Sequence, residues 1–479
     1  MDGKIYPADE RYAEYFRDES QFCGNADEIS FPDGEAAARS ILRELRRRKV
    51  PVTVQGGKTG IVGSGVPLGG HLMNVSNFNR VTGFSESGGA RMLTVEPGLR
   101  LSELRRAVAG LESPVRLFWP PDPTETSATL GGIAAMDASG ISAFAYGPTR
   151  NYIEAARVIL ADGTMREIRR GENFLEIGGL RLDELDAFLG GEGMLGMFAA
   201  LTLRLIPRPA EQWGIAFFFS RREDAWLLAD RLQRNAEFSR DAKVTAAEYA
   251  DRESLGLVEV NREIFSALNG LPAVAPEADA MIYLEISGEE TGVESAAETL
   301  MGWAEECGGD PDGAWAVSGE KEIETLRAYR HAIPESVNLA VAGNHRSCPK
   351  ITKLSTDLSF PGRKFSDVMG WYRKKCEPVG PARCVFGHIG DSHVHCNFLA
   401  KDAAQQERCE RWMSSALREA SGLGARAVGE NGIGKLKRRW IPADGEPAAR
   451  MRALKERYDP DGFWNPGNMF PSGPDGVPG

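Results

Sequence analysis

The chain has 479 residues, 42% of them hydrophobic, which is more than one ordinary hydrophobic core holds, so two or three domains are expected. The formal charge of −11, from 57 basic and 68 acidic side chains, argues against nucleic acid or an anionic membrane surface as the main partner. No stretch reaches the roughly 18 uninterrupted apolar residues of a transmembrane segment, and the charged start lacks the apolar core of a secretory signal, so we expect a cytoplasmic protein.

The cysteine content points in the same direction. The seven cysteines are scattered along the chain and contain no CxxC pair. Such spacing is typical of a reducing compartment. It also gives no sequence basis for an iron–sulfur cluster.

The first third of the chain alternates helix and strand periods. A helical period over 35–48 is followed by a short buried strand at 50–54, which runs straight into glycine. Further strands are predicted at 92–95 and 156–160, and prolines mark a domain boundary near 206–209. This part is predicted to be a mixed α/β block.

Beyond that boundary the pattern changes. Strands are predicted at 215–219 and 281–286, helices at 223–236 and 291–306, and a further helix at 405–421. The simplest interpretation is an α+β layer with a sheet covered on one face. The fold class expected for the whole chain is therefore α+β.

A glycine-rich loop follows the first predicted strand. Residues 55–65 read QGGKTGIVGSG, and such a loop can curl its backbone N–H groups around a pyrophosphate. The Walker pattern fails because Val52 stands where it needs glycine, and the spacing also fails the GxGxxG fingerprint of Rossmann sites. A plain flexible turn is the alternative. Two later clusters, at 130–133 and 190–196, favour a large dinucleotide approached by backbone from several sides.

The segment 387–398 reads GHIGDSHVHCNF and holds three of the six histidines of the chain. If its second half is a strand, His393, His395 and Asn397 share one face. The turn that follows His388 can fold that residue back towards the same face. Imidazole suits zinc, manganese or ferrous iron.

Two histidines and one carboxylate would bind such a metal and leave open positions for a substrate. Glu430, flanked by glycines in VGENGIGK, is the candidate carboxylate. Histidines that are satisfied by hydrogen bonds in a β core are the alternative.

Taken together, these motifs resemble the FAD-binding domain of the vanillyl-alcohol-oxidase-type flavoproteins. Within that group the chain most resembles the FAD-linked dehydrogenases of D-2-hydroxy acids, namely D-lactate dehydrogenase, D-2-hydroxyglutarate dehydrogenase and the glycolate oxidase D subunit. The motifs that carry the resemblance lie at 55–65, 72–76, 79–81, 95–98, 121–124, 131–132, 146–147, 160–163, 191–196, 387–395, 429–435 and 458–468.

The resemblance implies a two-subdomain FAD-binding domain of the vanillyl-alcohol-oxidase (PCMH) type and an α+β cap domain with an antiparallel sheet. We expect the FAD-binding domain at 1–210 and the substrate or cap domain with the metal histidines at 211–420. A C-terminal helical segment at 421–470 would complete the flavin and metal site. The composition of 471–479 predicts a disordered tail.

The resemblance also implies FAD, which we expect to be bound non-covalently because the glycine loop contains no histidine. In the resembling family the residues that match His388, His395 and Glu430 bind a divalent metal. The expected FAD-binding residues are Gln55, Gly56, Gly57, Lys58, Thr59, Gly60, Gly63, Ser64, Pro121, Asp122, Thr124, Gly131, Gly132, Gly191, Glu192, Gly193 and Asn465.

The chain departs from the family at two positions. The relatives typically read H-x-G-D-G-N-x-H and E-H-G-I-G, whereas histidine stands at 393 and asparagine at 431 here, as if the two had changed places. In the relatives the histidine after the glutamate is the proposed base. We hypothesise that His393 takes that role and that Asn431 fills the hydrogen-bonding place its partner left. A changed substrate, or a site that has lost the chemistry, is the alternative.

A carboxylate substrate also needs a cation, and the planar fork of arginine meets both of its oxygens. Arg330 matches the substrate arginine of the family, and Lys353 is a second candidate. Ser355 stands where some relatives have a lysine, which leaves the tail of the substrate open. An ordinary surface arginine is the alternative for Arg330.

The sequence therefore predicts an FAD-dependent dehydrogenase that oxidises a D-2-hydroxy acid to a 2-oxo acid, with a divalent metal (zinc, manganese or iron) at the site. Electrons would pass to an electron-transfer flavoprotein, a quinone or a partner subunit. Assembly as a homodimer is a further possibility that the sequence leaves open. Two other functions remain: non-redox flavin chemistry, as in the ether-lipid synthases of the same superfamily, and an FAD- or metal-binding subunit without catalysis of its own.

Overall fold

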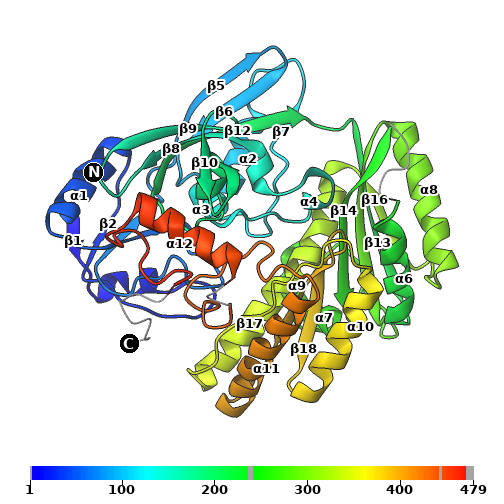
Figure 1. The fold of residues 1–479 in the computed structure, drawn as a ribbon. Coiled ribbons are helices and arrows are strands. Elements are labelled where there is room, and N and C mark those ends of the chain that lie inside the picture. Colours follow the sequence, from blue (N-terminus) through cyan, green and yellow to red (C-terminus); the bar gives the residue numbers. More distant parts are fainter. Residues whose placement is uncertain (1–2, 236–240, 442–444, 471–479) are drawn as a thin grey trace. The chain divides into compact units, whose positions relative to one another are not determined.

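The computed structural model describes residues 3–235, 241–441 and 445–470, so the tail predicted at 471–479 lies outside the described residues (Figure 1). The chain forms two compact units. The first contains Met1–Gly140, Pro148–Arg208 and Glu430–Gly479, and the second contains Ile141–Gly147 and Pro209–Gly429. Of the helices in the described ranges, none has both the length and the apolar character that crossing a membrane requires.

The first unit begins with a small, mainly parallel sheet. Its strands are β1 (Ile5–Pro7), β2 (Glu28–Ser30), β3 (Val52–Gln55) and β4 (His71–Asn74), in the order β1-β2-β4-β3. The short helix η1 (Glu10–Phe16) precedes β2, and α1 (Glu35–Arg47) connects β2 to β3. The helix predicted at 35–48 is confirmed, and its apolar face, which includes Ile41 and Leu45, is buried in the core.

A second, antiparallel sheet completes the framework of this unit. Its strands are β5 (Val81–Ser87), β6 (Ala90–Val95), β12 (Met197–Pro207), β8 (Ile153–Ile159) and β9 (Met165–Arg169) in that order, with β7 (Leu117–Phe118) also paired to β12. The first unit also contains the hairpin of β10 (Phe174–Ile177) and β11 (Leu180–Asp183) and the helices α2 (Leu101–Ala109), α3 (Leu130–Met136), η2 (Thr149–Tyr152), α5 (Glu184–Phe188) and α12 (Glu446–Tyr458). The two sheets of the first unit share one hydrophobic core.

The C-terminal segment returns to the first sheet. The Val52 N–H donates to the carbonyl of Phe463 at 2.7 Å, and the Asn465 N–H donates to the carbonyl of Val52 at 2.8 Å. Trp464 between them is fully buried, in a core that also contains side chains from α1 and from both sheets. The Asp459 carboxylate accepts from the Trp464 N–H at 2.7 Å and fixes this turn. The segment 463–465 is therefore part of the core of the first unit.

The second unit is built on one seven-stranded sheet in which every pairing is antiparallel. Its strands, in spatial order, are β16 (Trp315–Ser318), β13 (Glu211–Phe219), β15 (Ala280–Gly288), β14 (Ala242–Asp251), β18 (Arg383–His388), β19 (His393–Phe398) and β17 (Leu354–Ser355). Its helices are α4 (Ala143–Tyr146), α6 (Arg222–Leu232), α7 (Arg252–Val260), η3 (Arg262–Ile264), η4 (Ser266–Leu268), α8 (Glu290–Glu306), α9 (Glu320–Ser347), α10 (Phe365–Cys376), η5 (Glu377–Val379) and α11 (Ala403–Gly422). The predicted antiparallel sheet of an α+β domain is confirmed.

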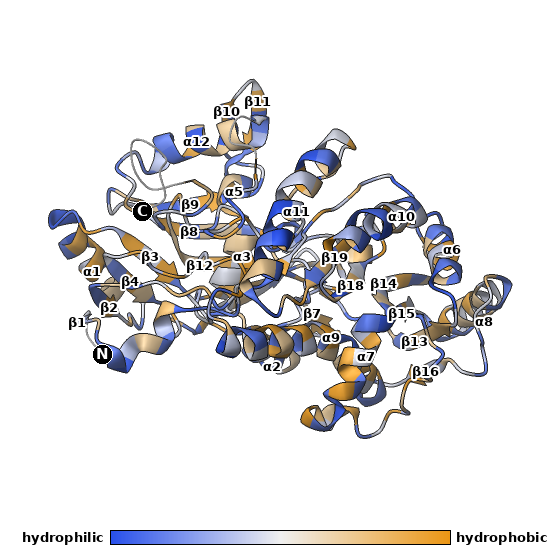
Figure 2. Ribbon diagram, turned by 90° about the horizontal axis from the view of Figure 1, so that it is seen from below, coloured by the Kyte–Doolittle hydropathy of each residue, from blue (hydrophilic) through white to orange (hydrophobic). Residues whose placement is uncertain are grey.

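Helices cover both faces of this sheet, with α7 and α9 on one side and α6 and α10 on the other (Figure 2), so the expectation of cover on one face was wrong. The reason lies in strands such as β13, which reads WGIAFFF and is apolar on both faces. Ala216 packs into the core beneath α9, while Ile215 and Phe217 alternate to the opposite face and are also buried. A strand that is apolar on both faces needs cover on both.

We predict that Trp464→Ala lowers the free energy of unfolding of the first unit by about 3–5 kcal/mol, because it leaves a large cavity in a core that both sheets share. Urea unfolding followed by far-UV circular dichroism measures this loss. The control is Trp303→Ala on α8. Because the Trp303 side chain is only partly buried, this substitution should lower the free energy of unfolding much less. An equal loss in the two variants would contradict the role of Trp464 as an anchor of the core.

Candidate cofactor and metal sites

The predicted glycine loop begins where β3 ends. The Gln55 side chain ties the two ends of the loop together, because its Nε2 donates to the carbonyl of Gly65 at 2.9 Å. The same Nε2 also donates to the carbonyl of Tyr15 at 2.8 Å. A Cβ atom at Gly57 would lie 2.7 Å from the carbonyl oxygen of Ser127. The loop therefore runs against the segment before α3 at a distance that only glycine permits.

The Thr129 hydroxyl lies where two of the glycine clusters meet. A Cβ at Gly56 would collide with this oxygen, and a Cβ at Gly132 would lie 3.3 Å from it. The Thr129 Oγ1 is buried and has no hydrogen-bond partner among the described residues. A buried hydroxyl without a partner, set in a glycine cradle, fits a site that a polar cofactor completes. The sequence analysis did not single out Thr129.

The third glycine cluster joins the same region through Glu192. Its carboxylate accepts from the Ile433 N–H at 2.6 Å and the Gly434 N–H at 2.9 Å, and from the Ser64 hydroxyl at 3.1 Å. Burial raises the pKa of the Glu192 carboxyl against the opposing effect of these donors. The Asn465 amide donates to the carbonyl of Glu192 at 2.8 Å. The three clusters predicted from the sequence thus converge in the first unit.

Two buried charged groups hold the far end of the loop. The Gly63 N–H donates to Asp18 at 2.9 Å, and burial raises the pKa of the Asp18 carboxyl to about 6. The Lys435 ammonium donates to the carbonyl of Ser64 at 3.1 Å and to Asn468 Oδ1 at 2.6 Å, and burial lowers its pKa to about 7. The last stretch of the chain therefore fixes the conformation of the first glycine loop.

The PDPT segment at 121–124 lies against the loop that ends α3. A Cβ at Gly140 would collide with the carbonyl of Asp122, and Gly140 has a left-handed φ of +86° that favours glycine. The Gly140 N–H donates to Glu430 Oε2 at 3.3 Å. The structure thus brings the PDPT segment and the candidate metal carboxylate together within the first unit. The roles of Pro121, Asp122 and Thr124 in FAD binding stay predictions.

The three histidines lie on the β18–β19 hairpin of the second unit, where His388 stands opposite His393. Their ring centroids are 5.3 Å apart for His388 and His393, 5.9 Å for His388 and His395, and 4.7 Å for His393 and His395. The predicted strand and the predicted return of His388 to the same face are confirmed. The structure therefore gathers three imidazoles into one cluster.

Each of the three rings has one nitrogen held by an oxygen of the second unit. The His388 Nδ1 lies 2.6 Å from Glu248 Oε1, and the His395 Nδ1 lies 3.2 Å from the carbonyl of Thr356. The His393 Nε2 lies 2.8 Å from Asp357 Oδ1. Such contacts fix the tautomer and aim the second nitrogen, as they do in metal-binding histidines. This donor set fits a divalent metal ion.

Arg330 forms an ion pair with Glu248, in which its Nη2 and Nε donate to Glu248 Oε2 at 2.6 and 3.0 Å. Burial alone would raise the pKa of the Glu248 carboxyl, but His388 and Arg330 more than offset this and lower it. Glu248 therefore links Arg330 to His388. The sequence analysis missed Glu248, although a single carboxylate in the apolar strand AAEYA of β14 is a signal that a buried partner exists.

The chain passes from the second unit to the first between Gly429 and Glu430. A Cβ at Gly429 would collide with the His393 ring, so the last residue of the second unit packs directly on the histidine cluster. Asn431 follows Glu430 and belongs to the first unit. The roles of Glu430 and Asn431 stay predictions.

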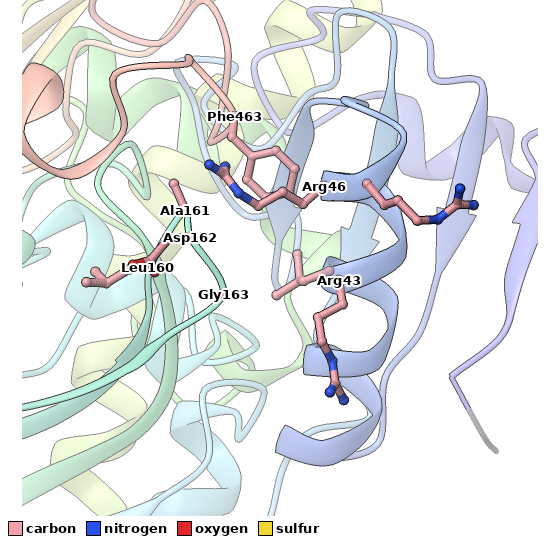
Figure 3. A pocket seen from close by; sticks show the side chains of 9 residues that line it. Arg43, Arg46, Leu160, Ala161, Asp162, Gly163 and Phe463 are labelled. Carbon is pink, nitrogen blue, oxygen red and sulfur yellow. The ribbon is translucent and has the colours of Figure 1, made fainter.

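A separate cavity of about 250 Å³ lies between α1 and the β8–β9 turn (Figure 3). Arg46 and Phe463 contribute to its lining. Arg46 pairs with Asp461 at 3.1 Å and Arg47 with Glu44 at 2.8 Å, so two of the three arginines here already have acidic partners. The cavity contains none of the residues predicted to bind FAD, metal or substrate.

Solved structures share this fold. The 4-ethylphenol oxidase from Gulosibacter chungangensis aligns with a TM-score of 0.72 at 16% identity, over 97% of this chain and 94% of that one. An alkyldihydroxyacetonephosphate synthase aligns with a TM-score of 0.65 at 16% identity, over 93% of this chain and 77% of that one. Together with the two-sheet first unit, these likenesses confirm the predicted PCMH-type fold.

Curated relatives are similar over nearly their whole length. The glycolate oxidase subunit GlcD of Bacillus subtilis (strain 168) is 27% identical over 92% of this chain and 89% of its own. The D-lactate dehydrogenase of Anaerostipes hadrus is 25% identical, over 90% of this chain and 86% of its own. The D-2-hydroxyglutarate dehydrogenase of Stutzerimonas stutzeri (strain A1501) is 24% identical, over 92% of this chain and 90% of its own.

Two family models divide the chain between them. The FAD binding domain matches residues 26–169, which include the glycine loop and the PDPT segment. The C-terminal domain of FAD linked oxidases matches residues 228–469, which include the histidine cluster. Because this second match spans more than half of the chain, the chain belongs to the family of FAD-linked oxidases and is an FAD-binding oxidoreductase.

Proposed function

We propose that the protein is a dehydrogenase that oxidises a 2-hydroxy acid of D configuration to a 2-oxo acid, with a divalent metal at the site. The observation that carries this proposal is the cluster of three imidazoles, each backed by an oxygen acceptor, in a chain of the FAD-linked oxidase family. The names of the relatives supply the substrate class, because they include glycolate, D-lactate and D-2-hydroxyglutarate.

The residues proposed to bind FAD are those of the three glycine clusters, the PDPT segment and Asn465. The convergence of the clusters supports this assignment, as does the buried Thr129 hydroxyl between Gly56 and Gly132. Backbone N–H groups of the first loop would donate to the phosphates. The side chain of Lys58 is already engaged by Glu14 at 3.0 Å, so we assign its contribution to the backbone.

When bound, FAD supplies the acceptor for the hydride, and the divalent ion supplies positive charge beside the hydroxyl and carboxylate of the substrate. His388 and His395 would bind the ion through Nε2, since Glu248 and Thr356 occupy the Nδ1 positions. Glu430 is the proposed third ligand. The peptide bond from Gly429, which packs on His393, supports this because it tethers Glu430 within one residue of the cluster.

His393 is proposed as the base that removes the hydroxyl proton. Asp357 accepts from its Nε2, so the proton would be taken up at Nδ1. Asn431 is proposed as the hydrogen-bonding neighbour of this site. The ring of His393 lies only 4.7 Å from that of His395, so binding of the ion through the same Nδ1 is the competing role, and it would exclude the role of base.

Arg330 is proposed to bind the substrate carboxylate. Its Nε and Nη2 donate to Glu248, so the contact would use Nη1.

The electron acceptor, whether an electron-transfer flavoprotein, a quinone or a partner subunit, stays a prediction, as do a homodimeric assembly and a cytoplasmic location. So do the two alternatives of non-redox flavin chemistry and of a subunit without catalysis.

We expect that a D-2-hydroxy acid bleaches the flavin absorbance of the purified protein under anaerobic conditions, and that chelation of the metal abolishes the bleaching. The test is a panel of D- and L-2-hydroxy acids added before chelation, after chelation and after restoration with Zn²⁺, Mn²⁺ or Fe²⁺. A flavin that none of the acids reduces, in a protein with its metal bound, would contradict the proposed oxidation and favour the alternatives without net redox turnover.

We expect His393→Asn to retain FAD and metal while the rate constant of flavin reduction falls by about 10²–10⁴, the range typical of a lost general base. Stopped-flow absorbance gives the rate, and elemental analysis of the same sample gives the metal content. Loss of the metal together with the rate would instead assign His393 as a ligand. Unchanged reduction would exclude both roles.

We expect Gly56→Ala to lower the ratio of bound FAD to protein severalfold, because the added Cβ would collide with the Thr129 hydroxyl and close the cradle. The ratio follows from flavin absorbance after release with denaturant. Gly83→Ala on β5 is the matched control, because a Cβ there meets nothing within 4 Å. Full FAD content in the Gly56 variant would contradict the proposed cofactor site.

A further inference from the structure

We propose that Glu248 is the positioning residue of the metal site, and that Arg330 acts on His388 through it. This inference rests on the proposed function, because it takes His388 to be a metal ligand. It gives Arg330 a second task besides the proposed contact with the substrate carboxylate.

The geometry places Glu248 between a helix and a strand. Glu248 on β14 stands directly opposite His388 on β18 in the register of the sheet. One carboxylate oxygen, Oε1, contacts His388 Nδ1 at 2.6 Å. The other, Oε2, accepts both donors of Arg330 from α9, at 2.6 and 3.0 Å. The three side chains therefore form one chain of hydrogen bonds from α9 to the histidine cluster.

Burial of the two charged groups of this arrangement costs free energy. The side chains of Glu248 and Arg330 are only 2% and 5% exposed. A buried ion pair loses its hydration and is often no more stabilising than apolar side chains of the same volume. A contribution to stability alone is thus a weak explanation for a charged pair at this point of the sheet. The contact of Glu248 with His388 supplies a specific explanation for this pair.

A neighbouring pair shows what the same residues do without a histidine. Arg327, three residues before Arg330 on α9, donates to both oxygens of Glu285 at 2.6 Å. Glu285 lies on β15, where its strand partner is Ala246 of β14, and it accepts from Tyr283 at 2.5 Å. In this pair Glu285 is fully buried and the side chain of Arg327 is 14% exposed. The two pairs differ in that Glu248 touches a candidate metal ligand, so Arg327–Glu285 is an internal control.

Glu248 would act by fixing His388 in one tautomer and one orientation. A carboxylate accepts the Nδ1 proton, which places the lone pair of the ring on Nε2 and limits rotation of the imidazole. Arg330 would hold the carboxylate in place, since its two donors converge on Oε2 and leave Oε1 directed at His388. Loss of such an outer contact typically costs about 10- to 100-fold in metal affinity.

If Arg330 acts through Glu248, its removal should change the metal affinity as well as the substrate affinity. An arginine that touches only the substrate changes substrate affinity and leaves metal affinity as it was. An arginine that acts through Glu248 changes metal affinity as well, and its removal adds nothing once the carboxylate is gone. Coupling between the two residues in metal binding therefore separates the two tasks.

The experiment is a double-mutant cycle on metal affinity with the full-length, FAD-loaded protein. Glu248→Gln, Arg330→Met and the double variant are stripped of metal, and the dissociation constant for Zn²⁺ is measured by competition with a chromophoric chelator. We expect Glu248→Gln to weaken binding about 10- to 100-fold. Arg330→Met should weaken it as well, and the double variant should be no weaker than Glu248→Gln within about twofold.

Two further measurements guard against a general loss of structure. Glu285→Gln and Arg327→Met, the control pair, should leave the dissociation constant for Zn²⁺ unchanged within about twofold. Glu248→Asp retains the charge but withdraws the carboxylate from His388 by one methylene, so it should also weaken Zn²⁺ binding. Retained FAD and an unchanged far-UV circular dichroism spectrum establish that each variant is folded.

The possible failures are distinguishable. Wild-type protein that binds Zn²⁺, with unchanged affinity in folded Glu248→Gln and Glu248→Asp, overturns this inference and leaves the proposed function standing. Additive effects of Glu248→Gln and Arg330→Met overturn the route from Arg330 through Glu248. Wild-type protein whose Zn²⁺ affinity does not respond to His388→Ala overturns the metal site of the proposed function, and this inference with it.

Discussion

The register of the β18–β19 hairpin is the constraint on which the candidate metal site depends. In an antiparallel pair, a slip by one residue would turn the side chains of one strand to the opposite face of the sheet. The observed register sets His388 opposite His393 and leaves His395 two residues further along the same face. The alternate residues Val394 and Cys396 are fully buried on the other face. The apolar partners of that face therefore hold the imidazoles together.

The glycine clusters depend on a different constraint, the contact of the segment 463–465 with the first sheet. Asn465 donates its backbone N–H to Val52 and its side chain to Glu192, so it connects β3 with the third cluster. Lys435 and Asn468 hold the first loop at Ser64 in the same way. The candidate cofactor site is thus assembled from segments some 400 residues apart in sequence, Ser64 and Asn468 for example. A loop that looks local in sequence depends on the far end of the chain for its shape.

Local periodicity was enough to predict part of this structure. The alternation in HVHCNF predicted the strand and the shared face of His393 and His395, because a period of two residues is a property of the segment itself. The helix over 35–48 followed from its apolar spacing in the same way. The family resemblance supplied the PCMH-type fold and FAD, which neither glycine spacing nor composition alone could supply.

The partners of the functional side chains were beyond such prediction, because they come from other elements. Glu248 reaches His388 across 140 positions of sequence, and Asp357 reaches His393 across 36. Thr129 meets Gly56 only because the loop before α3 folds against the end of β3. The expectation of cover on one face failed because strands such as β13 are apolar on both faces of the sheet.

The pairing of Asp357 with His393 bears on the predicted exchange of histidine and asparagine between positions 393 and 431. An asparagine at 393 could donate its amide to Asp357, but it would have no group able to accept a proton from a substrate. A histidine there keeps a contact with Asp357 through Nε2 and adds a basic nitrogen on the other side of the ring. Asp357 is buried, so its contact with His393 Nε2 supplies a hydrogen-bond partner that its carboxylate needs there. His393 therefore lies on the hairpin that also holds His388 and His395, where the strand register and the contact with Asp357 fix the orientation of its ring.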